Sequence, residues 1–329
     1  MAEDTRLAAL KQFGAKALAT SAFTIAPASS DASFRRYFRI TTRDASWIAM
    51  DAPPEKENLG LFITIAQRFE SLGLHVPKIV AADLDAGLCL LSDLGNTSYF
   101  DALDAHNADR LYGDAQGALI VLQGGIFSDP NFLPPYDAHA LRREMDLFPA
   151  WYLEPYLGRK LSSADHDLLN RSFDGLICSA LAQPRVWVHR DYHSRNLMVN
   201  NYHNPGILDF QDALSGPITY DLVSLLKDCY IVWPRPQVVE WVKGYCQLAR
   251  ESGLHGCEND DQFLEWFDKM GIQRHLKVAG IFARLHLRDG KSRYLADLPL
   301  TMHYLREATA LYADLEDLHR FLCALPQSP

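Results

Sequence analysis

The fold of this chain is decided by residues 189–196, which read His-Arg-Asp-Tyr-His-Ser-Arg-Asn. Short apolar runs at 197–199 and 206–210 predict two strands directly after this stretch. A hairpin of these strands would bring Asn196 and Asp209 together, although they stand 13 residues apart in the sequence. Asn196 carries an amide oxygen and Asp209 a carboxylate, and both are hard ligands that suit Mg²⁺.

The pattern H-R-D-x-x-x-x-N is that of the catalytic loop of kinases, and Asp209-Phe210 stands in the place of the D-F-G that follows it there. Phosphoryl transfer develops charge on the transferred group, so its catalysis needs mostly positioning and electrostatic stabilisation. We expect Asp191 to accept the proton of the attacking hydroxyl. In the alternative interpretation, Asp191 and Asp209 are turn and strand-end residues with structural hydrogen bonds, but this leaves their joint spacing unexplained.

The composition is that of an ordinary globular protein with an acidic balance. The 329 residues include 32 Lys+Arg and 41 Asp+Glu, a formal charge of −9, which argues against a dedicated nucleic-acid binder. Six cysteines without a C-x-x-C pair predict reduced thiols rather than a disulfide scaffold or a zinc ribbon. No apolar run approaches the roughly 20 residues that span a bilayer, and the first residues do not resemble a signal peptide. We therefore expect a cytoplasmic protein with neither membrane nor nucleic-acid partners.

The pattern along the chain predicts a small sheet-rich part followed by a mostly helical part. In the first part, strands are expected at 34–40, 47–50, 78–82 and 88–91, and helices at 5–18 and 55–72. In the second part, helices are expected at 97–105, 108–124, 137–156, 162–182, 220–229, 236–252, 260–287 and 300–324. A short β-rich island at 186–210 interrupts them. We expect residues 1–94 to form a nucleotide-covering lobe and residues 95–329 to form the lobe with the catalytic loop and the acceptor site.

Over nearly its whole length, the chain resembles the aminoglycoside phosphotransferase-like branch of the protein-kinase-like superfamily. The two motifs above carry this resemblance, together with residues 216–221, Gly-Pro-Ile-Thr-Tyr-Asp. The resemblance implies a two-lobed α+β fold, with a small antiparallel-sheet N-lobe and a mostly helical C-lobe, and ATP and Mg²⁺ as cofactors. It also implies that Asp191 is the base, that Asn196 and Asp209 bind Mg²⁺, and that Asp221 caps a helix and braces the loop.

Further segments are similar to the anomeric amino-sugar kinases of peptidoglycan recycling. They are Asp-Ala-Ser-Phe-Arg-Arg-Tyr-Phe-Arg at 31–39, Met-Asp-Ala-Pro-Pro-Glu at 50–55, Leu-Ser-Asp-Leu-Gly at 91–95 and Asp-Phe-Gln-Asp-Ala at 209–213. Those enzymes use ATP to phosphorylate the anomeric hydroxyl of N-acetylmuramate and N-acetylglucosamine. The resemblance implies an enzyme with a small amino-sugar substrate. Two alternatives stay open: a kinase of an aminoglycoside, aminoalcohol or other sugar, and a nucleotide-binding pseudokinase.

The nucleotide site departs from the kinase pattern, because the sequence has no G-x-G-x-x-G loop and no lysine in the predicted strand at 47–51. Either another cation replaces that lysine, with Arg35, Arg36 and Lys56 as candidates, or the nucleotide is held differently. The predicted nucleotide contacts are Ser33, Arg35, Arg36, Ser92, Asp93 and Leu94. The predicted substrate contacts are His193, Arg195, Glu144 and Trp151, because aromatic faces suit a sugar ring and charged groups suit its hydroxyls or a carboxylate.

Overall fold

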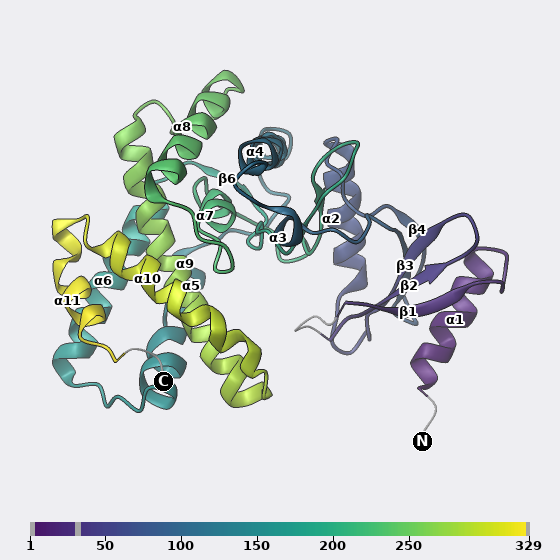
Figure 1. The fold of residues 1–329 in the computed structure, drawn as a ribbon, viewed down its shortest axis with the longest axis horizontal. Helices are drawn as coiled ribbons and strands as arrows, with labels where there is room; N and C mark the ends of the chain where they lie inside the picture. Colours follow the sequence, from purple (N-terminus) through teal and green to yellow (C-terminus); the bar gives the residue numbers. More distant parts are fainter. Residues whose placement is uncertain (1–3, 30–33, 327–329) are drawn as a thin grey trace. The chain divides into compact units, whose positions relative to one another are not determined.

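The computed structural model describes residues 4–29 and 34–326, which fall into two compact units (Figure 1). Unit 1 takes the chain up to Ala102 together with Asn196–Asp212, and unit 2 takes Leu103–Arg195 together with the chain from Ala213 onward. The hairpin that follows the catalytic loop therefore belongs to unit 1, whereas the first seven residues of that loop belong to unit 2. The division into lobes of 1–94 and 95–329 stays a prediction.

Unit 1 is built on a five-stranded antiparallel sheet. Its order is β1-β2-β3-β5-β4, with β1 at Thr24–Ser29, β2 at Arg36–Thr41, β3 at Ser46–Asp51, β4 at Ile79–Asp83 and β5 at Leu88–Ser92. Helix α1 (Thr5–Ala17) buries Leu10 on one face of the sheet, against Phe38, Ile40 and Leu90. Helix α2 (Leu59–Ser71) lies on the other side of the sheet (Figure 1).

Two departures from the predicted elements of unit 1 have local causes. Strand β1 was not predicted, because Pro27 lies within it; the strand is at the edge of the sheet, where a missing N–H is tolerated, and its pairing with β2 shifts at Pro27. Helix α2 begins at Leu59 rather than at residue 55, because residues 53–57 form a turn first. The Asn58 side chain then caps the helix by accepting a hydrogen bond from the backbone N–H of Leu61 at 2.9 Å.

A small hairpin completes unit 1. Strand β7 (Leu197–Met198) pairs with β8 (Gly206–Ile207) in antiparallel register, as the sequence predicted. The ring of Phe210 then stacks on Phe62 of α2, with ring centres 5.0 Å apart, and contacts Phe69 of the same helix. Buried aromatic contacts thus attach the end of the hairpin to α2. The short helix α3 (Tyr99–Ala102) is also in this unit.

Unit 2 is mostly helical. Its helices are α4 (Ala108–Gly124), α5 (Ala138–Met145), α6 (Ser163–Leu181), α7 (Tyr220–Leu226), α8 (Arg235–Glu251), α9 (Asp260–Asp289), α10 (Leu298–Thr309) and α11 (Glu316–Cys323). Shorter elements join them: the 3₁₀ turns η1 (Gly125–Phe127), η3 (Ser292–Asp297) and η4 (Ala313–Leu315), and the π-helix η2 (Phe148–Tyr156). Strand β6 (Arg185–Val188) pairs with β9 (Leu214–Pro217). Of these two strands, β9 was not predicted.

Helix α9 is the central element of unit 2, and most of its residues from Met270 to Leu285 are buried. At Gly280 it approaches the chain just before η2 so closely that a Cβ atom would lie 2.4 Å from the carbonyl carbon of Leu147. The predicted helix at 137–156 is in fact α5 followed by η2. The predicted helix at 300–324 is interrupted after Thr309 and resumes at Glu316.

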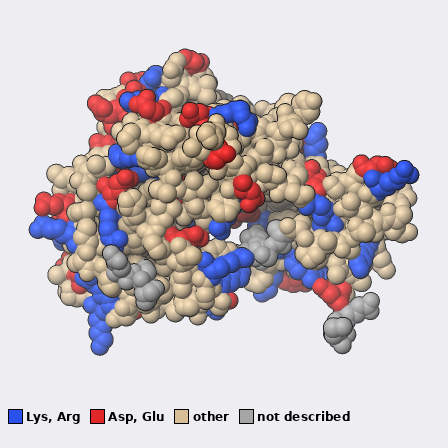
Figure 2. All heavy atoms as spheres, in the orientation of Figure 1, with Lys and Arg blue, Asp and Glu red and all other residues tan. Residues whose placement is uncertain are grey.

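Over the face drawn in Figure 2, basic and acidic side chains are interspersed on the surface. Within the residues that the structure describes, no helix combines the length and the apolar character needed to cross a membrane.

Candidate active site

In unit 1, the hairpin brings the two predicted metal ligands together. The backbone N–H of Leu208 donates to the carbonyl oxygen of Asn196 at 2.9 Å, which continues the pairing of β7 with β8 by one step. Asp209 follows directly, with a φ of +61°. This left-handed conformation is uncommon for a residue with a side chain and is characteristic of functional positions.

The carboxylate of Asp209 contacts two donors of the same unit. Its Oδ1 atom accepts a hydrogen bond from Nε2 of Gln211 at 2.9 Å and lies 3.4 Å from Nη2 of Arg35. Nε of Arg35 lies 3.5 Å from Oε2 of Glu57, so this buried guanidinium links the two carboxylates. Of the three candidate cations, the structure thus places Arg35 on Asp209. The ammonium of Lys56 lies instead 5.3 Å from the centre of the Phe34 ring.

A pocket of unit 1 opens beside this group. Its lining includes Arg35, Met50, Glu57, Asn58, Phe62 and Gln211. The Oε1 atom of Gln211 is buried and has no hydrogen-bond partner among the described residues. The pocket therefore offers a cation, a carboxylate and an unused amide acceptor close to Asp209.

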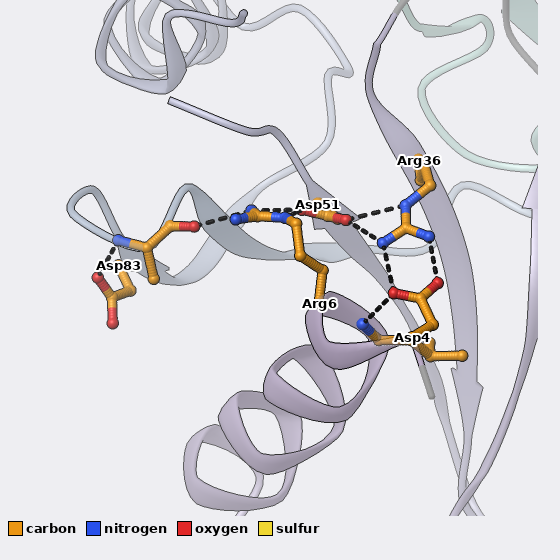
Figure 3. A network of polar contacts seen from close by, with 7 residues as sticks. Asp4, Arg6, Arg36, Asp51 and Asp83 are labelled. Atoms are coloured by element: carbon orange, nitrogen blue, oxygen red, sulfur yellow. Dashed lines mark hydrogen bonds and ion pairs between the residues drawn. The ribbon is translucent and has the colours of Figure 1, made fainter. Parts of the chain in front are cut away.

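Arg36 has different partners from those of Arg35, although the two residues are consecutive. Its guanidinium donates to Oδ2 of Asp51 from Nε at 2.9 Å and from Nη2 at 2.6 Å, and it also contacts Asp4 (Figure 3). Arg6 of α1 donates to Oδ1 of Asp51 at 2.7 Å and to the carbonyl oxygen of Ala86. The fully buried Asp51 side chain thus sits between two arginines and ties α1 to β2 and β3.

The other predicted nucleotide contacts are at the end of β5 or outside the described residues. The Ser92 hydroxyl accepts from the backbone N–H of Lys78 at 2.9 Å, and Leu94 is buried. The Asp93 carboxylate accepts two hydrogen bonds from Arg39, at 2.6 and 3.0 Å. Burial raises the pKa of Asp93, but Arg39 and the other donors outweigh it, so the pKa lies below its ordinary value. Ser33 lies outside the described residues.

In unit 2, the start of the catalytic loop is fixed by a buried carboxylate. Asp221 accepts hydrogen bonds from the backbone N–H groups of His189 and of Arg190, the latter at 2.9 Å. Arg190 has a φ of +78°, so the loop turns sharply just before Asp191. The predicted brace is present, but the cap is not: Thr219 is the N-cap residue of α7, and Asp221 lies in its first turn. Burial raises the pKa of Asp221 to about 7.

The surroundings of Asp191 are positively charged. Burial alone would raise the pKa of its carboxyl group, but the charges of Lys277, His193, Arg190 and Arg274 lower it, and the pKa lies below its ordinary value. Asp191 is therefore ionised at neutral pH and able to accept a proton. Two of these cations, Arg274 and Lys277, lie three residues apart on α9.

Glu144 is part of this charged environment rather than an exposed group. It forms ion pairs with Arg190 and with Lys277, the latter at 3.1 Å, and it accepts hydrogen bonds from the hydroxyl of Tyr136 and from Gln273. Burial raises the pKa of Glu144, but Lys277 and Arg190 more than compensate, so that it lies below its ordinary value. The carboxylate holds the arginine that precedes Asp191.

The remaining predicted substrate contacts are in two places. His193 is two residues after Asp191, and its ring meets the Tyr230 ring edge-on, with centres 5.5 Å apart. The Arg195 guanidinium stacks over the same Tyr230 ring at 3.5 Å from its centre. Trp151 lies in η2, where it packs partly buried against the hydrophobic core of unit 2.

Comparison with known proteins shows the family of the chain. The pattern of the phosphotransferase enzyme family (APH) matches residues 24–258. The chain belongs to this family. A curated relative, the N-acetylmuramate/N-acetylglucosamine kinase of Pseudomonas aeruginosa, is 48% identical over 301 residues, which are 92% of this chain and 88% of that protein. The protein of the same name from Neisseria meningitidis is 44% identical, over 92% of this chain and 91% of its own length.

Solved structures agree on the fold of this family member. An aminoglycoside phosphotransferase with bound ADP matches with a TM-score of 0.59 at 13% identity, over 92% of this chain and 98% of that one. An ethanolamine kinase of Plasmodium vivax matches with a TM-score of 0.62 at 11% identity, over 95% of this chain and 88% of that one. The predicted two-lobed kinase-like α+β fold is thereby confirmed.

The donor set of this phosphotransferase suits a metal that is only partly held by protein. Among the described residues, no three His, Cys, Asp or Glu side chains are grouped to hold an ion. Mg²⁺ is usually bound by one or two carboxylates together with phosphates and water rather than by a complete protein cage. One carboxylate and one amide, at Asp209 and Asn196, fit that requirement.

Sequence reasoning missed Arg274 and Lys277 as neighbours of Asp191. It also missed Gln211 as a partner of Asp209 and the pairing of Glu57 with Arg35. Arg274 and Lys277 lie inside a long buried helix, where nothing in the sequence relates them to Asp191. Gln211 could have been noticed, because it stands where the D-F-G sequence has its glycine.

Proposed function

We propose that this phosphotransferase uses ATP to phosphorylate the anomeric hydroxyl of N-acetylmuramate and N-acetylglucosamine, as a cytoplasmic enzyme of cell-wall recycling. The observation that carries this proposal is the pair of relatives at 48% and 44% identity, each matched over 92% of this chain and each named for these two sugars. The partners are thus ATP and a small amino sugar. Residues 1–94 would cover the nucleotide, and residues 95–329 would bind the acceptor.

Asp191 is the proposed base. Its depressed pKa keeps it ionised, and the hydrogen bond that the backbone N–H of Arg190 donates to Asp221 holds the chain just before it. The carboxylate takes the proton of the anomeric hydroxyl while that oxygen bonds to the γ-phosphorus of ATP. The bond between this phosphorus and the β–γ bridging oxygen breaks, and ADP leaves.

Asn196 and Asp209 are the residues that would hold Mg²⁺. The ion, when bound, would neutralise charge on the β- and γ-phosphates. The contacts of Asp209 with Gln211 and Arg35 hold one of its carboxylate oxygens in place. Asn196 is kept beside it by the backbone bond to Leu208.

Arg35 is the proposed replacement for the missing lysine. Its guanidinium contacts the carboxylates of Asp209 and Glu57, as the ATP-binding lysine of kinases is placed beside a metal-binding aspartate and a helix glutamate. This planar group can bind phosphate oxygens with two hydrogen bonds. Arg36 is engaged with Asp51 and Asp4 and has a structural role in this proposal. Ser33, Ser92, Asp93 and Leu94 remain proposed nucleotide contacts.

The test is an assay of ADP release with Mg²⁺-ATP and a panel of acceptors: the two amino sugars, the 1-O-methyl glycoside of N-acetylglucosamine, glucose, choline and kanamycin. We expect turnover with the free amino sugars and none with the glycoside, which lacks only the reacting hydroxyl. Asp191→Asn should abolish this turnover while the circular dichroism spectrum stays unchanged. Turnover of kanamycin or choline alone would replace the proposed substrate, and ATP binding without any turnover would indicate a pseudokinase.

A further inference from the structure

Arg274 is a buried cation whose charge acts on Asp191 but which has no carboxylate in direct contact among the described residues. Its exposed fraction is only 4%, and it forms no ion pair with any described acidic residue. Its hydrogen bond within the described structure runs from Nη1 to the thiol sulfur of Cys229, a weak acceptor, at 3.5 Å. Burying a guanidinium in this way is costly, and a residue that keeps such an arrangement is a candidate for binding an anion.

The neighbouring carboxylate does not serve Arg274 as a partner. Asp228 accepts hydrogen bonds from the backbone N–H and the hydroxyl of Ser194 on one oxygen and from the backbone N–H of Tyr230 on the other, at 2.8 Å. These neutral donors occupy both of its oxygens. Next along α9, His275 bonds to the carbonyl oxygen of Lys227 at 2.9 Å, so that the helix is held firmly against the segment 227–230.

Two further groups from the catalytic loop converge on the same segment. The Arg195 guanidinium lies on the face of Tyr230 and 3.9 Å from an oxygen of Asp297. The His193 ring lies at the edge of Tyr230, and its Nδ1 atom is buried without a hydrogen-bond partner among the described residues. His193 also donates its backbone N–H to the carbonyl oxygen of Asp191 at 3.0 Å. The nitrogen groups of Arg274, Arg195 and His193 therefore gather around Cys229 and Tyr230. Of these three residues, His193 is only two positions from the proposed base in the sequence.

We propose that Arg274, together with Arg195 and Nδ1 of His193, forms a carboxylate-binding subsite for the sugar, and that this subsite reads the lactyl group of N-acetylmuramate. This rests on the proposed function and adds how the two sugars are told apart. N-acetylmuramate is N-acetylglucosamine with a lactyl ether on O3, and it carries one carboxylate that N-acetylglucosamine lacks. A guanidinium binds a carboxylate with charge-assisted hydrogen bonds, whereas the thiol of Cys229 is only a weak acceptor.

The first part of the test is a binding measurement that needs no turnover. Calorimetry on the full chain without ATP would compare N-acetylmuramate, its uncharged methyl ester and N-acetylglucosamine. We expect the acid to bind roughly 10- to 100-fold more tightly than the ester, the range typical for a hydrogen bond to a charged group. Equal binding of acid and ester would overturn the subsite.

The second part locates the residue. In Arg274→Gln, the ratio of kcat/KM for N-acetylmuramate to kcat/KM for N-acetylglucosamine should fall roughly 10- to 100-fold, mainly through KM for N-acetylmuramate. Arg274→Lys should retain part of the preference because it keeps the charge. Arg284→Gln is the matched control: it lies ten residues further along α9, roughly 15 Å away, also makes no ion pair with described residues, and should change neither sugar.

The outcomes separate this inference from the proposed function. Equal losses for both sugars in Arg274→Gln would show that the arginine supports Asp191 or the fold and does not read the carboxylate. If the acid binds better than the ester but no sugar is phosphorylated, the subsite stands and the proposed reaction is wrong. If Arg274→Gln does not fold, the ester comparison and Arg195→Gln, which we expect to weaken acid binding selectively, still decide the question.

Discussion

Replacement of Asp51 by asparagine is expected to lower the stability of the protein strongly. The carboxylate has no exposed surface, whereas its partners Arg6 and Arg36 are exposed by 36% and 39% of their side chains. Asparagine keeps the shape and one acceptor oxygen but removes the charge, so both guanidiniums then face a neutral amide inside the unit. Breaking a buried ion pair on one side costs about 3–5 kcal/mol, and because the arginines stay partly hydrated, we expect about 3 kcal/mol.

The matched control is Asp4→Asn. Asp4 contacts the same Arg36, but at the surface, where water replaces the lost interaction, so the change in stability should be close to the error of measurement. The assay is urea unfolding of the full chain, monitored by circular dichroism and by tryptophan fluorescence, with the slope of the transition compared between variants. Trp47 on β3 makes the fluorescence sensitive to unit 1.

Equal destabilisation by Asp51→Asn and Asp4→Asn would refute this reasoning, since burial would then not distinguish the two contacts. Arg36→Gln extends the test to function. It should lower stability in the same way as Asp51→Asn, yet leave KM for ATP unchanged at a temperature where the variant is folded. A rise in that KM would restore Arg36 as a nucleotide contact.

Three further predictions follow from other parts of the structure. Gly280→Ala should lower the free energy of unfolding, measured in urea, by about 2 kcal/mol or more, because the new methyl group meets backbone atoms. Gly271→Ala on the same helix meets only ordinary contacts, so it should leave this free energy unchanged or raise it by up to about 1 kcal/mol. Asp221 has a pKa near 7 in the folded state and about 3.9 when unfolded, so the native state binds more protons between these values. The stability of the wild type relative to Asp221→Asn should therefore fall as pH rises from about 4 to about 7, by at most about 1.4 kcal/mol per pH unit, and be constant above; a flat difference in urea unfolding across that range would contradict it. Arg35→Met should raise KM for ATP roughly tenfold or more with the sugar KM unchanged, and Arg35→Lys should do so less; unchanged steady-state kinetics in both would show that another cation serves the nucleotide.

The chemistry-bearing hairpin could be predicted because its signals are local. Two apolar runs at strand spacing, each next to a polar ligand, determine where Asn196 and Asp209 fall once the strands pair. The replacement for the lysine could not be chosen in the same way. Arg36 is the first residue of β2 and Arg35 directly precedes it. The side chains of consecutive residues in extended chain point in opposite directions, and the sequence does not say which of them leads to Asp209.

The residues around Asp191 on α9 were beyond sequence reasoning for another reason. The helix itself was predicted nearly to its ends, but buried residues cover almost its whole circumference between Met270 and Leu285. A helix of this kind has no polar face from which a buried charge such as Arg274 would stand out. The break after Thr309 was missed because neither glycine nor proline marks it, and only packing within unit 2 separates α10 from α11.

The absence of a lysine from β3 has a practical consequence for chemical labelling. Acyl-phosphate derivatives of ATP mark nucleotide-binding proteins by acylating a lysine held against the phosphates. In this enzyme β3 has Met50 and Asp51 at its end, and the exposed Lys56 faces an aromatic ring, so such reagents should mark the protein poorly. A dicarbonyl reagent that modifies guanidines should instead label Arg35, and ATP should protect this residue from the reagent. Surveys that count active kinases by lysine acylation would therefore not detect enzymes that lack this lysine.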